Sequence, residues 1–440
     1  MSERYIAAVE ISSSKIIAAV GKTSGAGQLD VIAVEQENCV DGVRYGIIQN
    51  LEETALMTAR IINRLEQRPG VAPRKIKSVF VGRSGRSLRN IPTEVSINLP
   101  DDTEITDDII NRLRSDALRT AIDNSLEVVD AVPRIYKIGK SETHSPKGAV
   151  GNCIHATYDL VVCRPELKRN IKRTLTDKLH IETEAFVVTA LATGHLILTP
   201  DEKRLGCMLV DMGAETTTVT IYRKGSLCYF ATIPLGGRNI TRDITSLNVL
   251  EVKAEEMKLT SGNAIAREST SSLNINGVKL SDISNLVVAR AEEIVANVVE
   301  QMEYAGLKES DLPGGIICIG GGSRLQGITD ILSQHAALPV RRGQLPAYVR
   351  IDDINAVNSE ISQVVSVLYA GATLSNRECL EIPARQEIPE IGTKPAPEVA
   401  VEDVEPAEKK PGRTGRLFNS ITERITRLFG NPDDNSELIE

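Results

Sequence analysis

Three short turns rich in glycine and hydroxyl residues constrain the fold of this chain more than any other feature. The first follows the apolar run that ends at Glu10, and the second follows the run that ends at Asp211. Each has the same order: a strand, an acidic residue, a tight turn of small residues and a second strand. The third turn, Gly320–Ser323, follows another apolar run closer to the C-terminus. This repetition predicts an α/β chain that uses one structural device twice.

The residue types in these turns indicate phosphate binding. Small residues let backbone N–H groups approach a phosphate closely, and hydroxyl groups add further donors. An acidic residue cannot bind phosphate directly, so its predicted role is to hold a hydrated Mg²⁺ ion. A single turn of this kind is weak evidence, because strand–glycine–strand hairpins are common. Two turns that face each other would grip a triphosphate, and the third would carry the nucleoside.

The series of turns resembles the superfamily of actin, heat-shock chaperone and sugar-kinase ATPases. Gly236 and Gly237 look like the glycine turn that opens a helix in the second half of actin. Glu255 and Lys258 resemble the residues that flank the adenine in bacterial actins. The alternative for this last pair is a solvated helix face with an i,i+3 ion pair. The resemblance implies an actin-like ATPase fold of two duplicated ribonuclease-H-like lobes, with ATP and Mg²⁺ as cofactors.

Carried over residue by residue, the resemblance implies a set of nucleotide contacts. They are Glu10, Ser12, Ser13, Ser14 and Lys15 in the first turn, Asp211, Gly213, Thr216 and Thr217 in the second, and Gly236, Gly237, Glu255, Lys258, Gly320, Gly321, Gly322 and Ser323 beyond them. Asp211, through water, and Glu10 are the predicted metal-side carboxylates. The usual Asp-x-Gly of the first turn is here Glu-x-Ser, and Glu215 stands where glycine is commoner. No catalytic base is identifiable, so we expect slow or negligible hydrolysis.

Composition excludes several other classes of protein. The 440 residues are 41% hydrophobic and 25% charged, as expected for a globular protein of several lobes. A net charge of −8 without an aromatic-studded basic stretch gives no reason to expect nucleic acid. Seven scattered cysteines without a C-x-x-C pair predict neither a zinc site nor a disulfide framework, and they fit a reducing cytoplasm. We expect no signal peptide and no membrane span.

Hydrophobic periodicity predicts an insertion in the first half of the chain. Residues 1–83 alternate strands with one helix, Leu51 to Glu66. Residues 84–165 differ, because two strand-like runs, Glu94–Leu99 and Ala156–Cys163, bracket an amphipathic helix from Thr106 to about Asn124. Residues 166–233 return to the first pattern, with a helix from Pro165 to Lys178. Residues 236–312 are predicted to be mostly helical, and the globular part is expected to end near Ser375.

The C-terminal segment divides into a linker and an amphipathic helix. Residues 381–412 hold six prolines and eight acidic residues against four basic ones, which predicts a disordered linker. Residues 413–430 carry a net charge of +3 and place their large apolar side chains in one helical sector about 120° wide. The predicted membrane-binding residues are Arg413, Arg416, Leu417, Phe418, Ile421, Arg424, Ile425, Arg427, Leu428 and Phe429. Such a helix suits the surface of an anionic membrane, and the alternative is a helix that docks on its own core.

An actin-like ATPase with this insertion and tail resembles the FtsA family of bacterial cell division proteins. Further similarities are Gly151-Asn152 and the segment Thr199–Gly206. The resemblance implies subdomain 1A at 1–83 and 166–205, an inserted α+β subdomain 1C at 84–165, 2A at 206–235, 2B at 236–312, 2A with a return to 1A at 313–380, and a tail at 431–440. It also implies self-assembly into protofilaments and a location on the cytoplasmic side of the inner membrane at the division site, with other division proteins as further partners.

The same resemblance implies that the protein tethers the tubulin-like GTPase FtsZ to the membrane. In this family the C-terminal peptide of FtsZ docks on subdomain 2B, and the best match to a peptide-contacting arginine is Arg290. The alternative is that Arg290 pairs only with Glu293 on its own helix. Other functions that remain open for such a chain are a small-molecule kinase, a chaperone ATPase and a pilus-assembly protein of the same fold.

Overall fold

A computed structural model describes residues 3–23, 28–39, 41–265, 274–275, 277–353 and 360–383 of the chain. No helix among these residues is long and apolar enough to cross a membrane. The predicted linker beyond residue 383, the amphipathic helix at 413–430 with its ten membrane-binding residues, and the tail lie outside the described residues.

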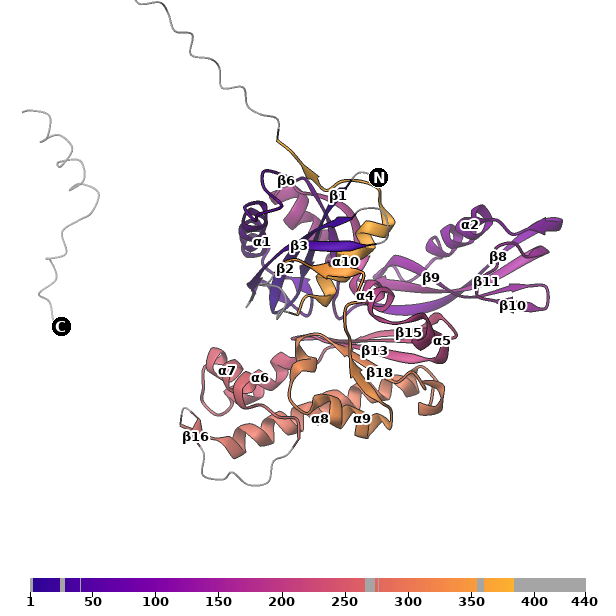
Figure 1. Ribbon diagram of the computed structural model, residues 1–440. Helices are drawn as coiled ribbons and strands as arrows, with labels where there is room; N and C mark the ends of the chain where they lie inside the picture. The colour runs from indigo at the N-terminus through magenta and orange to yellow at the C-terminus, as the bar shows by residue number, and fades with distance from the viewer. Residues whose placement is uncertain are drawn as a thin grey trace, which may run out of the picture. The chain divides into compact units, whose positions relative to one another are not determined.

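The first lobe is built on a six-stranded sheet in the order β12-β7-β1-β2-β3-β20 (Figure 1). Its strands are β1 (Arg4–Ile11), β2 (Lys15–Thr23), β3 (Leu29–Asn38), β7 (Ser78–Arg83), β12 (Glu182–Val188) and β20 (Val349–Ile351). The short strands of this lobe are β4 (Val43–Arg44), β5 (Ile47–Ile48), β6 (Lys75–Ile76) and β21 (Leu380–Glu381). Its helices are α1 (Leu51–Glu66), α3 (Pro165–Lys172), the π-helix η1 (Arg173–Lys178), α4 (Thr189–Ile197) and α10 (Ser362–Leu374). Helix α10 packs on β1 and β2 and encloses the core between them.

The second lobe carries five strands of a nine-stranded sheet, in the order β15-β14-β13-β18-β19. These strands are β13 (Cys207–Met212), β14 (Thr217–Arg223), β15 (Ser226–Ile233), β18 (Ile316–Ile319) and β19 (Val340–Arg342). Its other elements are α5 (Pro200–Leu205), α6 (Gly237–Thr245), α7 (Glu251–Ser261), β16 (Asn274–Ile275), β17 (Val278–Lys279), α8 (Leu280–Tyr304), η2 (Glu309–Asp311), η3 (Gly321–Arg324) and α9 (Ile328–Ala336). Helices α8 and α9 pack together beside this sheet (Figure 1).

The two lobes share one strand order. In each, three consecutive strands form an antiparallel meander, and two later strands lie parallel on the other side of the first. The first lobe runs β3-β2-β1-β7-β12, and the second runs β15-β14-β13-β18-β19. The duplicated lobes expected from the repeated turns are therefore confirmed.

The insertion forms its own α+β layer. It contains β8 (Arg89–Glu104), α2 (Asp107–Leu118), β9 (Glu127–Ile138), β10 (Ser141–Thr143) and β11 (Val150–Cys163) around a separate apolar core. Its sheet continues that of the second lobe through one residue pair, Ala231 with Arg89. The buried carboxylate of Asp159 accepts hydrogen bonds from Asn90 at 2.6 Å and from Arg134 Nε at 2.8 Å, and Arg134 also donates to the Cys228 carbonyl at 2.9 Å.

Helix α1 has the bounds that periodicity gave it, whereas α2 ends at Leu118, before its predicted end near Asn124. Asn50 caps α1 by accepting from the Glu53 N–H. The insertion strands are longer than predicted: Pro92 pairs within the β8–β11 ladder, and the ladder resumes at Thr103 after a register shift that contains Pro100. The globular part extends past its predicted end at Ser375, since Leu380 pairs with Ile76 in a two-stranded ladder.

Candidate nucleotide site

The first turn joins β1 to β2 and is held tightly by its own backbone. The Ser12 N–H and hydroxyl both donate to the Lys15 carbonyl, at 3.0 and 2.8 Å. The Ser13 hydroxyl accepts from the Gly46 N–H at 2.9 Å, and the Ser14 carbonyl accepts from the Cys39 N–H at 2.8 Å. These contacts fix the turn against the loops that follow β3 and β4.

Lys15 extends from the same turn toward α10. Its ammonium donates to Gln36 Oε1 at 3.0 Å and to the Glu360 carbonyl at 2.7 Å. Burial lowers the pKa of Lys15, the Glu360 charge partly restores it, and the Arg324 charge lowers it further. Arg324 directly follows the third turn. The first and third turns are therefore close enough for a charge beside one to act on a side chain of the other.

Glu10 ends β1 in an enclosed position. Its carboxylate accepts hydrogen bonds from the Thr189 hydroxyl at 2.8 Å and the Ser84 hydroxyl at 2.9 Å. Burial raises the pKa of Glu10 to about 7, although both hydrogen bonds act in the opposite direction. A Cβ atom at Gly82, on the adjacent strand, would lie 1.5 Å from Glu10 Oε2, so only glycine leaves room for this carboxylate.

Asp211 occupies the matching position at the end of β13. It accepts a hydrogen bond from Gln363 Nε2 on α10 at 3.0 Å. Burial first, then the charges of Glu360 and Glu10, raise the pKa of Asp211 to about 7. Because Glu10 acts on Asp211 through its charge, the acidic ends of the two repeated strands are close in space.

The second and third turns pack on each other through glycines. The Gly237 N–H donates to the Gly213 carbonyl at 3.0 Å, and a Cβ at Gly236 would lie 2.6 Å from that carbonyl. Gly320, with φ of +83°, leaves no room for a side chain, since its Cβ would lie 2.4 Å from Asp211 Oδ1. A Cβ at Gly322 would lie 2.9 Å from the Met212 carbonyl, whereas Gly321 faces open space.

The hydroxyl residues of these turns hold the backbone in place. Thr217 donates to the Leu235 carbonyl at 2.8 Å, and the buried Ser323 donates to the Gly320 carbonyl at 2.8 Å. The Thr216 carbonyl accepts from the Gly213 N–H at 2.8 Å, which closes the second turn. The structure therefore brings the predicted residues of the second and third turns together.

Glu255 and Lys258 reach this group from α7. They form the i,i+3 ion pair expected for a solvated face, at 2.7 Å. Lys258 is also largely buried and donates to the Gly237 carbonyl at 3.1 Å and the Thr241 hydroxyl at 3.0 Å. The pair is therefore a contact between α7 and the glycine turn that opens α6.

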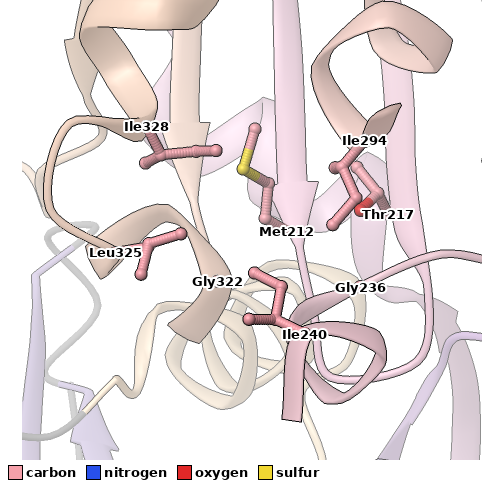
Figure 2. Close-up of a pocket in the computed structure, with 9 residues that line it drawn as sticks. Met212, Thr217, Gly236, Ile240, Ile294, Gly322, Leu325 and Ile328 are labelled. Carbon is pink, nitrogen blue, oxygen red and sulfur yellow. The ribbon is translucent and has the colours of Figure 1, made fainter. Parts of the chain in front are cut away.

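A small apolar pocket lies where these segments meet (Figure 2). Its lining combines glycines of two turns with side chains from α6, α8 and α9. The residues are Met212, Thr217, Gly236, Gly237, Ile240, Ile294, Gly322, Leu325 and Ile328. The pocket has room for about one water molecule, so a planar ring would lie beside it rather than inside it.

Glu215, which sequence alone leaves unplaced, is surrounded by arginines and by the backbone of the first lobe. Its fully buried side chain accepts from the Tyr45 N–H at 2.7 Å, Arg44 Nε at 2.9 Å and Arg242 Nη2 at 2.5 Å, with Arg238 Nη1 at 3.5 Å. Burial alone would raise the pKa of Glu215, but the Tyr45 and Arg242 hydrogen bonds hold it below its usual range. We call these five residues the Glu215 cluster, and it joins the second turn to the first lobe.

The carboxylates of Glu10 and Asp211, with the amide of Gln363 beside them, suit a hydrated magnesium ion. Carboxylate and amide oxygens are hard ligands of the kind that Mg²⁺ takes together with several waters and phosphate oxygens. Within the described ranges, no three His, Cys, Asp or Glu side chains are grouped closely enough to hold a metal directly. The residues therefore fit an ion held through water and ligand oxygens.

Arg290 is engaged on two sides. It forms a bidentate pair with Asp243 of α6, at 2.6 and 3.0 Å, and a further contact with Glu293. The helix pairing considered as an alternative is therefore present, together with a partner from a second helix. Its role toward a peptide stays a prediction.

Sequence reasoning missed four residues that position the carboxylates: Gly82, Ser84, Thr189 and Gln363. A signal existed for the first two, because Gly82-Arg83-Ser84-Gly85 is another small-residue turn after a buried strand. No local pattern marks Thr189 or Gln363, which approach only through the fold.

Two family models match the chain in the regions just described. "Cell division protein FtsA" matches residues 208–366, and "SHS2 domain inserted in FTSA" matches residues 85–162. The FtsA of Porphyromonas gingivalis is 29% identical over 365 residues, which is 80% of this chain and 74% of the relative. That of Streptococcus pneumoniae is 26% identical over 434 residues, 92% of this chain and 93% of the relative.

The chain belongs to the FtsA family. Among solved structures, the PilM–PilN complex of type IV pilus biogenesis matches it with a TM-score of 0.59 at 16% identity, covering 83% of this chain and 98% of that chain. That likeness concerns the fold alone, which is actin-like. FtsA membership favours a role in cell division over the kinase and chaperone alternatives. The α+β layer described above is the part of the chain that matches the domain inserted in FtsA, at residues 85–162.

Proposed function

We propose that this FtsA-family protein binds ATP with Mg²⁺ between its two lobes. The observation that carries the proposal is the pair of acidic strand ends, Glu10 and Asp211, which are close enough for one charge to raise the pKa of the other. A divalent cation supplies positive charge that relieves this repulsion and neutralises a triphosphate. Glu10 and Asp211 would hold the ion through water, while the small-residue turns donate N–H groups to the phosphates.

The adenine base of ATP would lie near the third turn. Glu255 and Lys258 flank the glycine turn that opens α6, and the apolar pocket adjoins it. We expect hydrolysis far below ordinary enzyme rates of about 1–10³ s⁻¹. Glu10 is already held by two hydroxyl donors, and Glu215 faces arginines, so neither is free to activate a water molecule.

We further propose that the protein polymerises and links FtsZ to the cytoplasmic face of the inner membrane at the division site. Support comes from FtsA membership and from the amphipathic sequence at 413–430. The assignment of 1A, 1C, 2A and 2B to the ranges given above is part of this proposal. Partners would be the FtsZ C-terminal peptide, further copies of the chain, anionic lipid and other division proteins.

Co-sedimentation with vesicles tests this function. FtsZ should pellet with phosphatidylglycerol-containing vesicles only when the protein is present. Phe418→Glu breaks the apolar side of the predicted helix and should strongly reduce sedimentation at any salt concentration, whereas Arg424→Gln should weaken it mainly at low salt. Unchanged sedimentation of FtsZ with the Phe418→Glu protein would refute membrane attachment through the tail.

The FtsZ contact needs its own variant. Arg290→Glu should abolish binding of the FtsZ C-terminal peptide, since reversal adds repulsion to the lost attraction. Because Arg290 also pairs with Asp243, the control is Asp243→Asn, which loosens that pair but keeps the arginine. Equal loss in both variants would assign Arg290 to holding α8 against α6 rather than to the peptide.

A further inference from the structure

One helix surface of the first lobe carries unusually concentrated positive charge. Five basic residues of α3 and its approach are exposed: Arg164, Lys168, Arg169, Lys172 and Arg173. At 100° per residue they occupy about half of the helix circumference. Leu167 and Ile171 bury the opposite half. We call this surface the basic face.

The basic face is neutralised only in part, since Glu166 is the one acidic residue of α3. Within the described residues, no ion pair involves Arg169, Lys172 or Arg173, and Lys168 contacts only the ring of Phe186, at 5.9 Å. Some exposed basic residues on other helices are paired, such as Arg60 with Glu37 and Lys253 with Glu256, and others, such as Arg112 of α2, are not. The concentration of basic residues on α3 stands out because the whole chain carries a net charge of −8.

The edge of the basic face meets α1. Lys178, at the end of η1, forms an ion pair with Glu52 of α1. Leu56, one turn after Glu52 on the same side of α1, is 61% exposed. The combined surface therefore presents spread cations with a single projecting apolar side chain at its border.

We propose that the basic face binds the surface of an anionic lipid bilayer directly. A single-stranded nucleic acid partner would need aromatic side chains for base stacking, and the basic face has none, while the net charge of −8 disfavours a duplex partner. A protein partner binds most strongly through a cluster of buried aromatic or aliphatic side chains, and here only Leu56 projects. A continuous layer of negative headgroups attracts exposed cations spread along one surface, which is what α3 presents.

This inference rests on the proposed function, in which the tail brings the protein to a membrane. The basic face adds a second, purely electrostatic contact, so that the globular part takes up a preferred orientation on the bilayer. Each neutralised cation should reduce vesicle affinity about fivefold at low salt, and much less at high salt.

The test compares two double variants of the full chain that lose the same charges. Arg169→Glu with Lys172→Glu alters the basic face. Arg112→Glu with Lys137→Glu alters exposed and unpaired basic residues of the insertion. Binding to mixed phosphatidylglycerol and phosphatidylcholine vesicles is measured for each, with Arg169→Gln and Lys172→Gln as a milder pair and thermal melting as a check on folding.

We expect at least a tenfold loss of affinity for the basic-face variants at low salt and less than a twofold loss for the insertion variants. Equal losses in both pairs would indicate a net-charge effect and overturn the proposal, as would unchanged binding of the basic-face pair. The same pairs are then compared in the Phe418→Glu background. Residual vesicle binding that still depends on the basic face supports the inference even if tail attachment fails. Vesicle binding that stays strong after Phe418→Glu refutes only attachment through the tail.

Discussion

The two repeated turns share a strand order but differ in what holds their carboxylates. Glu10 is bound within the first lobe, by hydroxyls of Ser84 and Thr189 that follow β7 and β12. Asp211 is partly exposed and is bound by Gln363 of α10, while its neighbour Glu215 is tied to Arg44 and Tyr45 of the first lobe. The first turn is therefore held within its own lobe, whereas the second turn connects the two lobes.

This difference predicts unequal roles in metal and nucleotide binding. Asp211→Asn should lower the affinity for a fluorescent ATP analogue about a hundredfold with Mg²⁺ present, because a charged ligand partner is lost. Glu10→Gln should lower it about tenfold, since its oxygens already accept two hydrogen bonds. Titrations with and without Mg²⁺ measure both. Equal losses in the two variants would show that the turns contribute alike.

The enclosed position of Glu10 predicts a stability effect at Gly82. Gly82→Ala would force the Glu10 carboxylate out of contact with both hydroxyls, at a cost of about 2 kcal/mol, as for other overpacked interiors. Urea unfolding measures it. Gly321→Ala is the control, because nothing lies within 4 Å of its added methyl group, and it should stay within about 0.5 kcal/mol. A neutral result at Gly82 would mean that the carboxylate moves freely.

The connection made by the second turn can be broken at Glu215. Glu215→Gln should cost about 1.5 kcal/mol, less than the 3–5 kcal/mol typical of a buried pair, since Arg44 and Arg242 keep 38% and 33% of their side chains exposed. The control is Glu37→Gln in a surface pair, for which about 0.5 kcal/mol is expected. If the two variants cost the same, Glu215 does not join the lobes.

The paired carboxylates also predict a pH dependence of stability without added nucleotide or divalent metal. Glu10 and Asp211 have folded-state pKa values raised to about 7 from 4.5 and 3.8, so the folded protein binds more protons than the unfolded chain between about pH 4 and pH 7. The free energy of unfolding should therefore fall as pH rises through this window. Asp211→Asn should flatten the curve, and an unchanged slope would assign it to other groups.

Much of this arrangement was predictable from sequence, because its signals are local. The turns after Glu10 and Asp211 stand next to their strands, and helix α1 follows from its apolar period and its Asn50 cap. The partners of the turns were not predictable. Arg44 lies 171 residues before Glu215, and Thr189 lies 179 residues after Glu10. Such pairings depend on the tertiary structure, which no local sequence pattern predicts.

The insertion enters and leaves the first lobe at one place. Its first and last strands run side by side, with Arg89 opposite Val162, and the Arg164 N–H donates to the Ser87 hydroxyl at 3.3 Å. A segment whose two ends meet can be gained, lost or exchanged without stretching the chain that carries it. Evolution could therefore have replaced this layer as a unit while the two lobes kept their shape, and an engineer could graft a reporter domain at the same junction.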